Sequence, residues 1–168
     1  MKKILLVALA LIVLAMSVAA AEGEIKIGQV QYAAHGTKCF AVMTVAMQGD
    51  VIADAYIDEF QFMAAGSIGV PNSEADFGAA YPEGKVLASK KVNGDAYSAN
   101  MANAGSTVHL CDNYAAIEAF VTGKTVAELE AAVAGKDAAA MVDAVSGCTL
   151  VDTLGYVNGL IEAAKAAK

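Results

Sequence analysis

The side chains with the clearest chemical potential lie near the C-terminal end, in residues Asp143–Thr149, which read DAVSGCT. They precede an apolar-periodic stretch, Leu150–Ala167, which predicts a helix. A small Ser-Gly segment that runs into a helix start presents unpaired backbone N–H groups and the positive end of the helix dipole. This arrangement suits a phosphate, and a hydroxyl in the first turn, such as that of Thr149, could carry one covalently. The segment therefore predicts a phosphate site.

The spacing Asp143-x-x-Ser146-Gly147-x-Thr149 resembles the flavinylation motif of the FMN-binding domain family. In that family the final Thr carries FMN through a phosphoester bond, so the resemblance implies that Thr149 is the attachment residue. It also implies that Gly147 lets the backbone approach the phosphate and that Ser146 hydrogen-bonds a phosphate oxygen. Asp143 would hold the turn or assist the modifying enzyme. Cys148 stands where the family usually has Ala, and because both residues are small we expect the turn to be kept.

The resemblance further implies a partner, a separate FAD-dependent FMN transferase. A Thr hydroxyl without activation is a poor nucleophile, and no His or Lys lies near Thr149 in the sequence to act as its base. The chain is therefore expected to be a substrate of the transferase and then an electron carrier, rather than a catalyst on its own. Its redox partners would be membrane reductases or other exported carriers.

The alternative from another class is a surface-exposed binding or structural module that has the same fold without flavin. In that case Ser146 or Thr149 is an ordinary helix cap, because Ser and Thr are common at this position. Six tyrosines are also available to stack on a flavin ring, but most tyrosines simply pack, so the sequence singles out none of them.

Histidine and cysteine residues form a second group with possible chemistry. His35-x-x-x-Cys39 and His109-x-Cys111 supply two nitrogens and two sulfurs, the ligand set of a tetrahedral zinc site. Neither spacing is that of a zinc finger or ribbon, and buried thiols with unrelated histidines are the alternative. With Cys148 the chain has three cysteines, and this odd number argues against a disulfide scaffold.

The N-terminal residues have the pattern of a signal peptide. Lys2 and Lys3 precede an apolar run, Ile4–Met16, and the small residues at 19–21 form an A-x-A cleavage site after Ala21. The apolar run is shorter than the roughly 20 residues that a membrane span needs, although an uncleaved anchor helix is the alternative. We therefore expect residues 1–21 to be removed and the rest to be extracytoplasmic, in the periplasm, at the cell surface or secreted.

Size and charge limit the function of the remaining chain, residues 22–168. Its length is that of a single domain. The whole sequence has 11 basic and 18 acidic residues, with a formal net charge of −7. Because the few lysines are dispersed, the chain lacks the basic footprint of a nucleic-acid-binding protein.

The first half of the mature chain is expected to be β structure. Residues 24–32 alternate in hydrophobicity and shift around Gly28, as in a bulged or bent strand. The clearest signal is a hairpin with its turn at 48–50, and this hairpin resembles the opening of the FMN-binding family. The expected strands are 24–32, 39–47, 51–62, 85–92 and 106–111, with loops at 64–84 and 93–105.

Helices are expected after residue 111. Asp112 or Asn113 would cap the first, Thr125 and Glu128 form a capping box for the second, and Asp137 would begin a short third. The last helix, 150–167, carries an apolar stripe of Leu150, Leu154, Val157, Ile161 and Ala164. Strands followed by helices predict an α+β domain, in which C-terminal helices pack against an antiparallel sheet.

Overall fold

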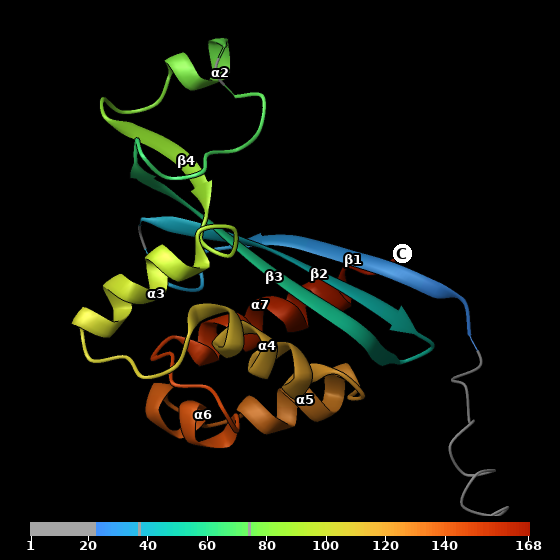
Figure 1. The fold of residues 1–168 in the computed structure, drawn as a ribbon. Coiled ribbons are helices and arrows are strands. Elements are labelled where there is room, and N and C mark those ends of the chain that lie inside the picture. The colour runs from blue at the N-terminus through green and yellow to red at the C-terminus, as the bar shows by residue number, and fades with distance from the viewer. Residues whose placement is uncertain (1–22, 37, 74) are drawn as a thin grey trace, which may run out of the picture.

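A computed structural model describes residues 23–36, 38–73 and 75–168 of the chain. The expected signal peptide and its cleavage site lie outside these residues. The described part contains a four-stranded antiparallel sheet in the order β1-β2-β3-β4 (Figure 1). The strands are β1 (Ile25–Tyr32), β2 (Cys39–Gln48), β3 (Val51–Ala64) and β4 (Lys85–Ser89).

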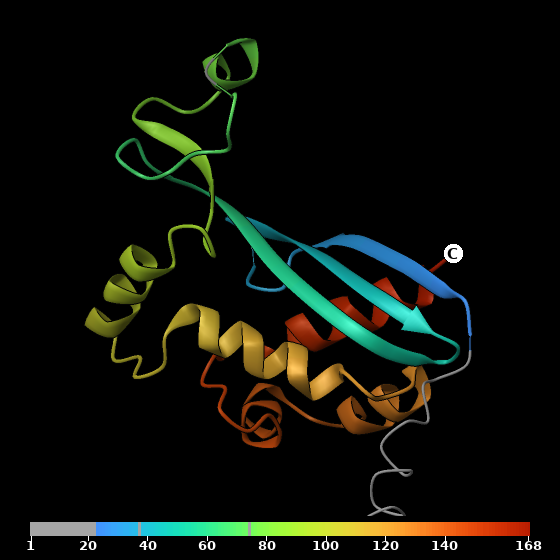
Figure 2. The ribbon, with the colours of Figure 1, turned by 45° about the vertical axis from the view of Figure 1, so that its right-hand side comes forward.

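Most of the helices lie on one face of this sheet, as the two ribbon views show (Figures 1 and 2). They are α2 (Asp76–Ala79), α3 (Gly94–Asn103), α4 (Leu110–Val121), α5 (Val126–Val133), α6 (Ala138–Ala144) and α7 (Thr153–Lys165). α7 packs against β1 and β2, α4 packs against β3, and α5 and α6 pack against α7. The predicted fold class, an antiparallel sheet with C-terminal helices packed on it, is confirmed.

The core forms because the strands alternate in polarity. Ala41, Met43 and Val45 of β2 point from the sheet into the core, where they are buried with Val157 and Leu160 of α7. The residues between them on β2 lie on the opposite face of the sheet. Among the residues that the structure describes, one face of the sheet is thus covered by helices, whereas the other is open.

The expected hairpin is confirmed, with Gly49 at φ +60° in the turn between β2 and β3. The expected bulge at Gly28 is wrong, because the β1–β2 register is continuous through this residue. Gly28 instead lies where the α7 backbone comes closest to the sheet, and a Cβ atom there would overlap the carbonyl oxygen of Ala163. The irregularity lies in the next pair of strands, between Ala46 and Met47.

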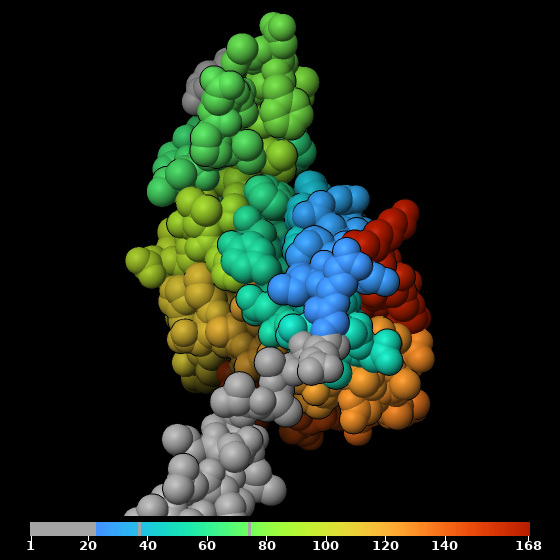
Figure 3. All heavy atoms as spheres, turned by 90° about the vertical axis from the view of Figure 1, so that its right-hand side faces the viewer, coloured from blue at the N-terminus to red at the C-terminus, as the bar shows by residue number. Residues whose placement is uncertain are grey.

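Figure 3 shows the C-terminal residues beside β1, where the Lys168 N–H donates to the Ile27 carbonyl.

The middle of the chain differs most from expectation. β4 ends at Ser89 rather than Val92, because the Asn93 side chain donates to the Ser89 carbonyl and begins a turn. The expected loop 93–105 contains α3, and the expected strand 106–111 is a loop followed by the first turn of α4. His109, not Asp112 or Asn113, caps α4, since its Nδ1 accepts the Cys111 N–H at 3.2 Å.

The helices after α4 largely agree with expectation. Thr125 and Glu128 form both halves of a capping box at the start of α5, and Asp137 caps α6. α7 begins at Thr153 rather than Leu150, because a hydrogen-bonded turn, from the Thr153 N–H to the Leu150 carbonyl, precedes it.

The end of β3, the loop with α2 and β4 form an arm that extends from the packed helices and sheet (Figures 1 and 2). Within the described ranges, no helix combines the length and the apolar character that crossing a membrane requires.

Candidate functional site

A cavity of about 620 Å³ lies at the end of the helical layer, between α3 and the loop that contains Thr149. Its wall includes the residue after β4, the loop before α4 and the first turn of α7. Lining residues used below are Lys90, Tyr97, Thr107, Leu110, Thr149 and Tyr156. We call it the Thr149 cavity. Its volume lies in the range of small-molecule and cofactor sites, and its walls combine apolar side chains with a few polar groups.

Thr149 is held at this cavity by Asn113 of α4. The fully buried Asn113 Oδ1 accepts the Thr149 backbone N–H at 2.7 Å and lies 3.3 Å from the Thr149 hydroxyl oxygen, which donates to it. The Asn113 Nδ2 group donates to the carbonyls of Val108 and His109 at 3.1 and 3.0 Å. Because both of these donors point to carbonyls, the amide cannot exchange its oxygen and nitrogen without losing hydrogen bonds. Asn113 therefore fixes the Thr149 loop against α4 and leaves the Thr149 residue exposed.

The other predicted motif residues precede Thr149 in the sequence, but none of them lines the Thr149 cavity. Asp143 lies near the end of α6 as an exposed residue, Ser146 is also exposed, and Gly147 has φ +86°, a conformation that favours glycine. Cys148 is buried, with its sulfur 3.1 Å from the Thr153 hydroxyl. The fold thus accommodates a small buried residue at position 148.

The expected place of Thr149, in the first turn of the last helix, is wrong. Thr149 lies four residues before Thr153, where α7 begins, and the N-cap position belongs to Asp152. The Asp152 carboxylate lies 2.6 Å from Nδ1 of His35, on the wall of the same cavity. A carboxylate at this helix start opposes a second anion there, so the α7 N-terminus alone does not form a phosphate site.

A buried ion pair also lines the Thr149 cavity. The Lys90 ammonium lies 2.6 Å from Oε2 of Glu59, and the two side chains are only 1% and 0% exposed. Oε2 also accepts the hydroxyls of Tyr114 at 3.1 Å and Tyr156 at 2.9 Å, while Oε1 accepts the Cys39 thiol at 3.3 Å. This carboxylate is therefore bonded on both oxygens, as a buried charge requires.

The pKa values of this cluster follow from burial and from Glu59. Burial lowers the pKa of Lys90, but the hydrogen bond and charge of Glu59, together with those of Tyr97, outweigh it, and the net shift is upward. Burial, with the nearby negative charge, raises the pKa values of Tyr114, Tyr156 and the Cys39 thiol. The cluster thus holds one ammonium, one carboxylate and three protonated donors.

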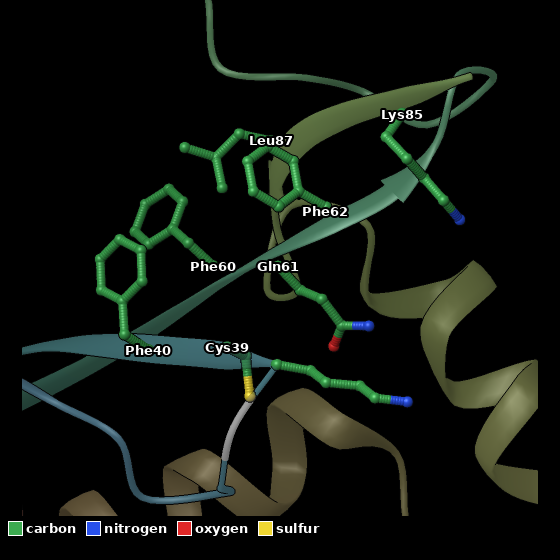
Figure 4. Close-up of a pocket in the computed structure, with 8 residues that line it drawn as sticks. Cys39, Phe40, Phe60, Gln61, Phe62, Lys85 and Leu87 are labelled. Atoms are coloured by element: carbon green, nitrogen blue, oxygen red, sulfur yellow. The ribbon is translucent and has the colours of Figure 1, made fainter. Parts of the chain in front are cut away.

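A second hollow, of about 610 Å³, lies on the open face of the sheet, where the arm leaves the body (Figure 4). Phe40 and Phe60 stack there with ring centroids 5.8 Å apart, and Phe62 and Leu87 lie beside them. Figure 4 shows the Cys39 sulfur on the opposite side of the sheet from these rings. This hollow lacks the buried ion pair and the exposed threonine of the Thr149 cavity, so the Thr149 cavity is the better candidate site.

The histidines and cysteines do not form the zinc alternative. His35 pairs with Asp152, Cys39 joins the Glu59 cluster, and His109 lies 3.1 Å from Asp95. In the described part of the chain, no group of three or more His, Cys, Asp or Glu side chains is arranged to hold a metal ion. All three cysteines are free thiols.

Sequence reasoning missed Glu59, Lys90 and Asn113. For Glu59 a signal exists, because it continues the inward-facing alternation of Ala55 and Ile57 on β3. Lys90 follows a short strand and Asn113 lies inside a helix, and neither position carries a local sign of its role. Comparisons of the chain with models of known protein families, with curated proteins and with solved structures found no match.

Proposed function

We propose that this protein is an exported electron carrier that holds FMN through a phosphoester bond to Thr149. The observation that carries the proposal is the position of Thr149, exposed on the wall of a cofactor-sized cavity and fixed there by Asn113. The resemblance of the Asp143–Thr149 segment to a flavinylation motif, drawn from the sequence, names the same residue independently.

The residues of the Thr149 cavity fit a flavin. Tyr97, Leu110 and Tyr156 supply aromatic and apolar wall for a planar ring, and Lys90 supplies a buried cation. FMN when bound supplies the redox chemistry, whereas the protein binds it, orients it and excludes water. Export would place this carrier between membrane reductases and other exported redox proteins.

Co-expression with an FAD-dependent FMN transferase tests the proposal. We expect one FMN per chain, located by mass spectrometry on the peptide that contains Thr149. Thr149→Val should abolish labelling, because it keeps the shape of the side chain and removes the hydroxyl that forms the bond.

Thr107→Val is the matched control, since Thr107 is also an exposed threonine on the wall of this cavity. It should be labelled as the wild type is. Labelling that persists in Thr149→Val would assign the flavin to another residue. If an active transferase labels a control domain and leaves the wild-type chain unlabelled, the flavin proposal is wrong, and a binding or structural module without flavin becomes the better account.

A further inference from the structure

We propose that Lys90 places its positive charge beside the pyrimidine side of the flavin ring and raises the reduction potential of the flavin. This inference rests on the proposed attachment of FMN to Thr149, because it assigns a role within the same cavity. The sequence motif does not contain Lys90, and the assignment comes from where the fold places its ammonium group.

Lys90 is held at the cavity by two strands. Its backbone N–H donates to the Glu59 carbonyl at 2.7 Å, so the pairing of β3 and β4 continues one residue beyond β4. Its ammonium reaches the Glu59 carboxylate at 2.6 Å and lies 4.8 Å from the centroid of the Tyr97 ring. A side chain fixed at both ends in this way presents its charge at a defined position, which a surface lysine would not do.

Within this cluster, the Lys90 ammonium rather than the Glu59 carboxylate supplies the charge that acts on a molecule in the cavity. Two hydroxyls and one thiol donate to Glu59 in addition to Lys90, and these donors offset the negative charge of the carboxylate. Lys90 itself donates to Glu59 and, at 3.5 Å, to the Cys39 sulfur. Tyr97 is a third partner, and its hydrogen bond contributes to the raised pKa of Lys90. The ammonium therefore acts on a bound molecule through its charge rather than through a free N–H group.

Reduction of the flavin explains what a cation at this position would do. Two electrons from a reductase, together with one proton, leave one negative charge in the pyrimidine half of the ring. A nearby ammonium in a site of low dielectric stabilises this charge, and it therefore stabilises the reduced form of the flavin more than the oxidised form. Lys90 would also oppose the binding of a second proton by the reduced ring.

The test uses the flavinylated protein, with attachment confirmed by mass, and measures its two-electron potential by spectroelectrochemistry. The double variant Lys90→Met/Glu59→Gln removes both charges together, so no buried charge is left without a partner. We expect the preference for the reduced flavin to fall at least tenfold, which lowers the potential by about 30 mV or more. Lys90→Arg, which keeps the cation, should retain most of the wild-type potential.

The matched control is Lys91→Met/Glu118→Gln. It makes the same charge change at the next residue, in an ion pair of 2.9 Å that is not part of the Thr149 cavity. Its potential should stay close to that of the wild type. Equal potentials in the two double variants would overturn the role of Lys90 while leaving the attachment to Thr149 standing. A wild-type chain without flavin would overturn both.

A measurement on the wild type covers the case in which the double variant does not fold. In mildly acidic buffer free FMN takes up two protons with two electrons, but the bound flavin should take up one. The potential should then change by about 30 mV per pH unit, the value for one proton per two electrons. Twice that slope would mean that no cation opposes the second proton, and it would contradict the inference.

Discussion

Among single residues, Glu59 is the centre of a buried cluster of polar side chains. A fully buried carboxylate is tolerated because Lys90, Tyr114, Tyr156 and Cys39 all donate to it. A buried ion pair is weak evidence for stability, because apolar residues of similar volume are often as stable or better. The pair also lies on the wall of the Thr149 cavity, where the proposed cofactor would bind.

The same cluster makes stability depend on pH in the alkaline range. The pKa values of Cys39, Tyr114 and Tyr156, ordinarily 9.0 and 10.0, and that of Lys90 are all raised in the folded protein. As pH rises, the unfolded chain therefore loses these protons before the folded chain does. Their contribution to the free energy of unfolding is complete below pH 9.0 and is lost progressively above it.

We expect the melting temperature to stay level from neutral pH to about pH 9 and then to fall. Thermal unfolding followed by circular dichroism over a series of alkaline buffers measures this. Tyr156→Phe removes one of the titrating groups, so its melting temperature should fall less steeply than that of the wild type. A constant melting temperature well beyond pH 10.0 would show that these groups are not protonated and buried as described.

Local sequence patterns indicate only part of the candidate site. The sequence points to Thr149 because a hydroxyl after a Ser-Gly turn has a recognisable spacing. Lys90 and Asn113 act through contacts 31 and 36 residues away in the sequence, with Glu59 and Thr149. No local pattern encodes such a contact, because it exists only after the strands and helices have packed.

At the scale of the elements, the fit between β1 and α7 depends on Gly28. A Cβ atom at this position would overlap the Ala163 carbonyl oxygen, and backbone cannot move aside as a flexible side chain can. We expect Gly28→Ala to push α7 from the sheet and to lower the free energy of unfolding by about 1–3 kcal/mol, the usual cost of overpacking. Urea unfolding followed by circular dichroism measures the change.

Gly66→Ala is the control for this prediction. A Cβ atom added at Gly66 would meet no heavy atom within 4 Å, and the residue lies outside the left-handed region, so alanine should be neutral or slightly stabilising there. Equal unfolding free energies for the two variants would mean that α7 does not approach β1 as closely as described.

The elements differ in how well their sequence specifies them. The hairpin around Gly49 and the capping box of α5 are predictable because turn and cap residues act over three or four positions. The sequence does not reveal α3, because residues 94–103 contain Gly, Asn and Ser and have little apolar periodicity. It predicts a strand over 106–111, but the His109 side chain caps a helix there, and this role depends on one ring nitrogen.

In the molecule as a whole, the helices cover one face of the sheet, and the Thr149 cavity lies at one end of this helical layer (Figure 1). Among the described residues, the opposite face of the sheet is open. The exposed apolar residues on the open face include Ile25, Ile27, Phe40 and Phe62. The proposed cofactor would thus lie near one end of a body from which the arm extends (Figure 2). An acidic carrier of this kind would meet its redox partners outside the cytoplasm if the N-terminal segment directs export.

The N-terminal residues predict export and cleavage of a signal peptide. Ala19 and Ala21 are the small residues that signal peptidase requires at positions −3 and −1, so cleavage should follow Ala21. N-terminal sequencing of the protein secreted by its own host should begin at Glu22. Ala21→Leu should block cleavage because it replaces a required small residue, whereas Ala20→Leu, at the position between them, should be processed as the wild type is. A native protein that retains Met1 or Lys2 would contradict the prediction and would favour an uncleaved membrane anchor, with the protein then tethered rather than released.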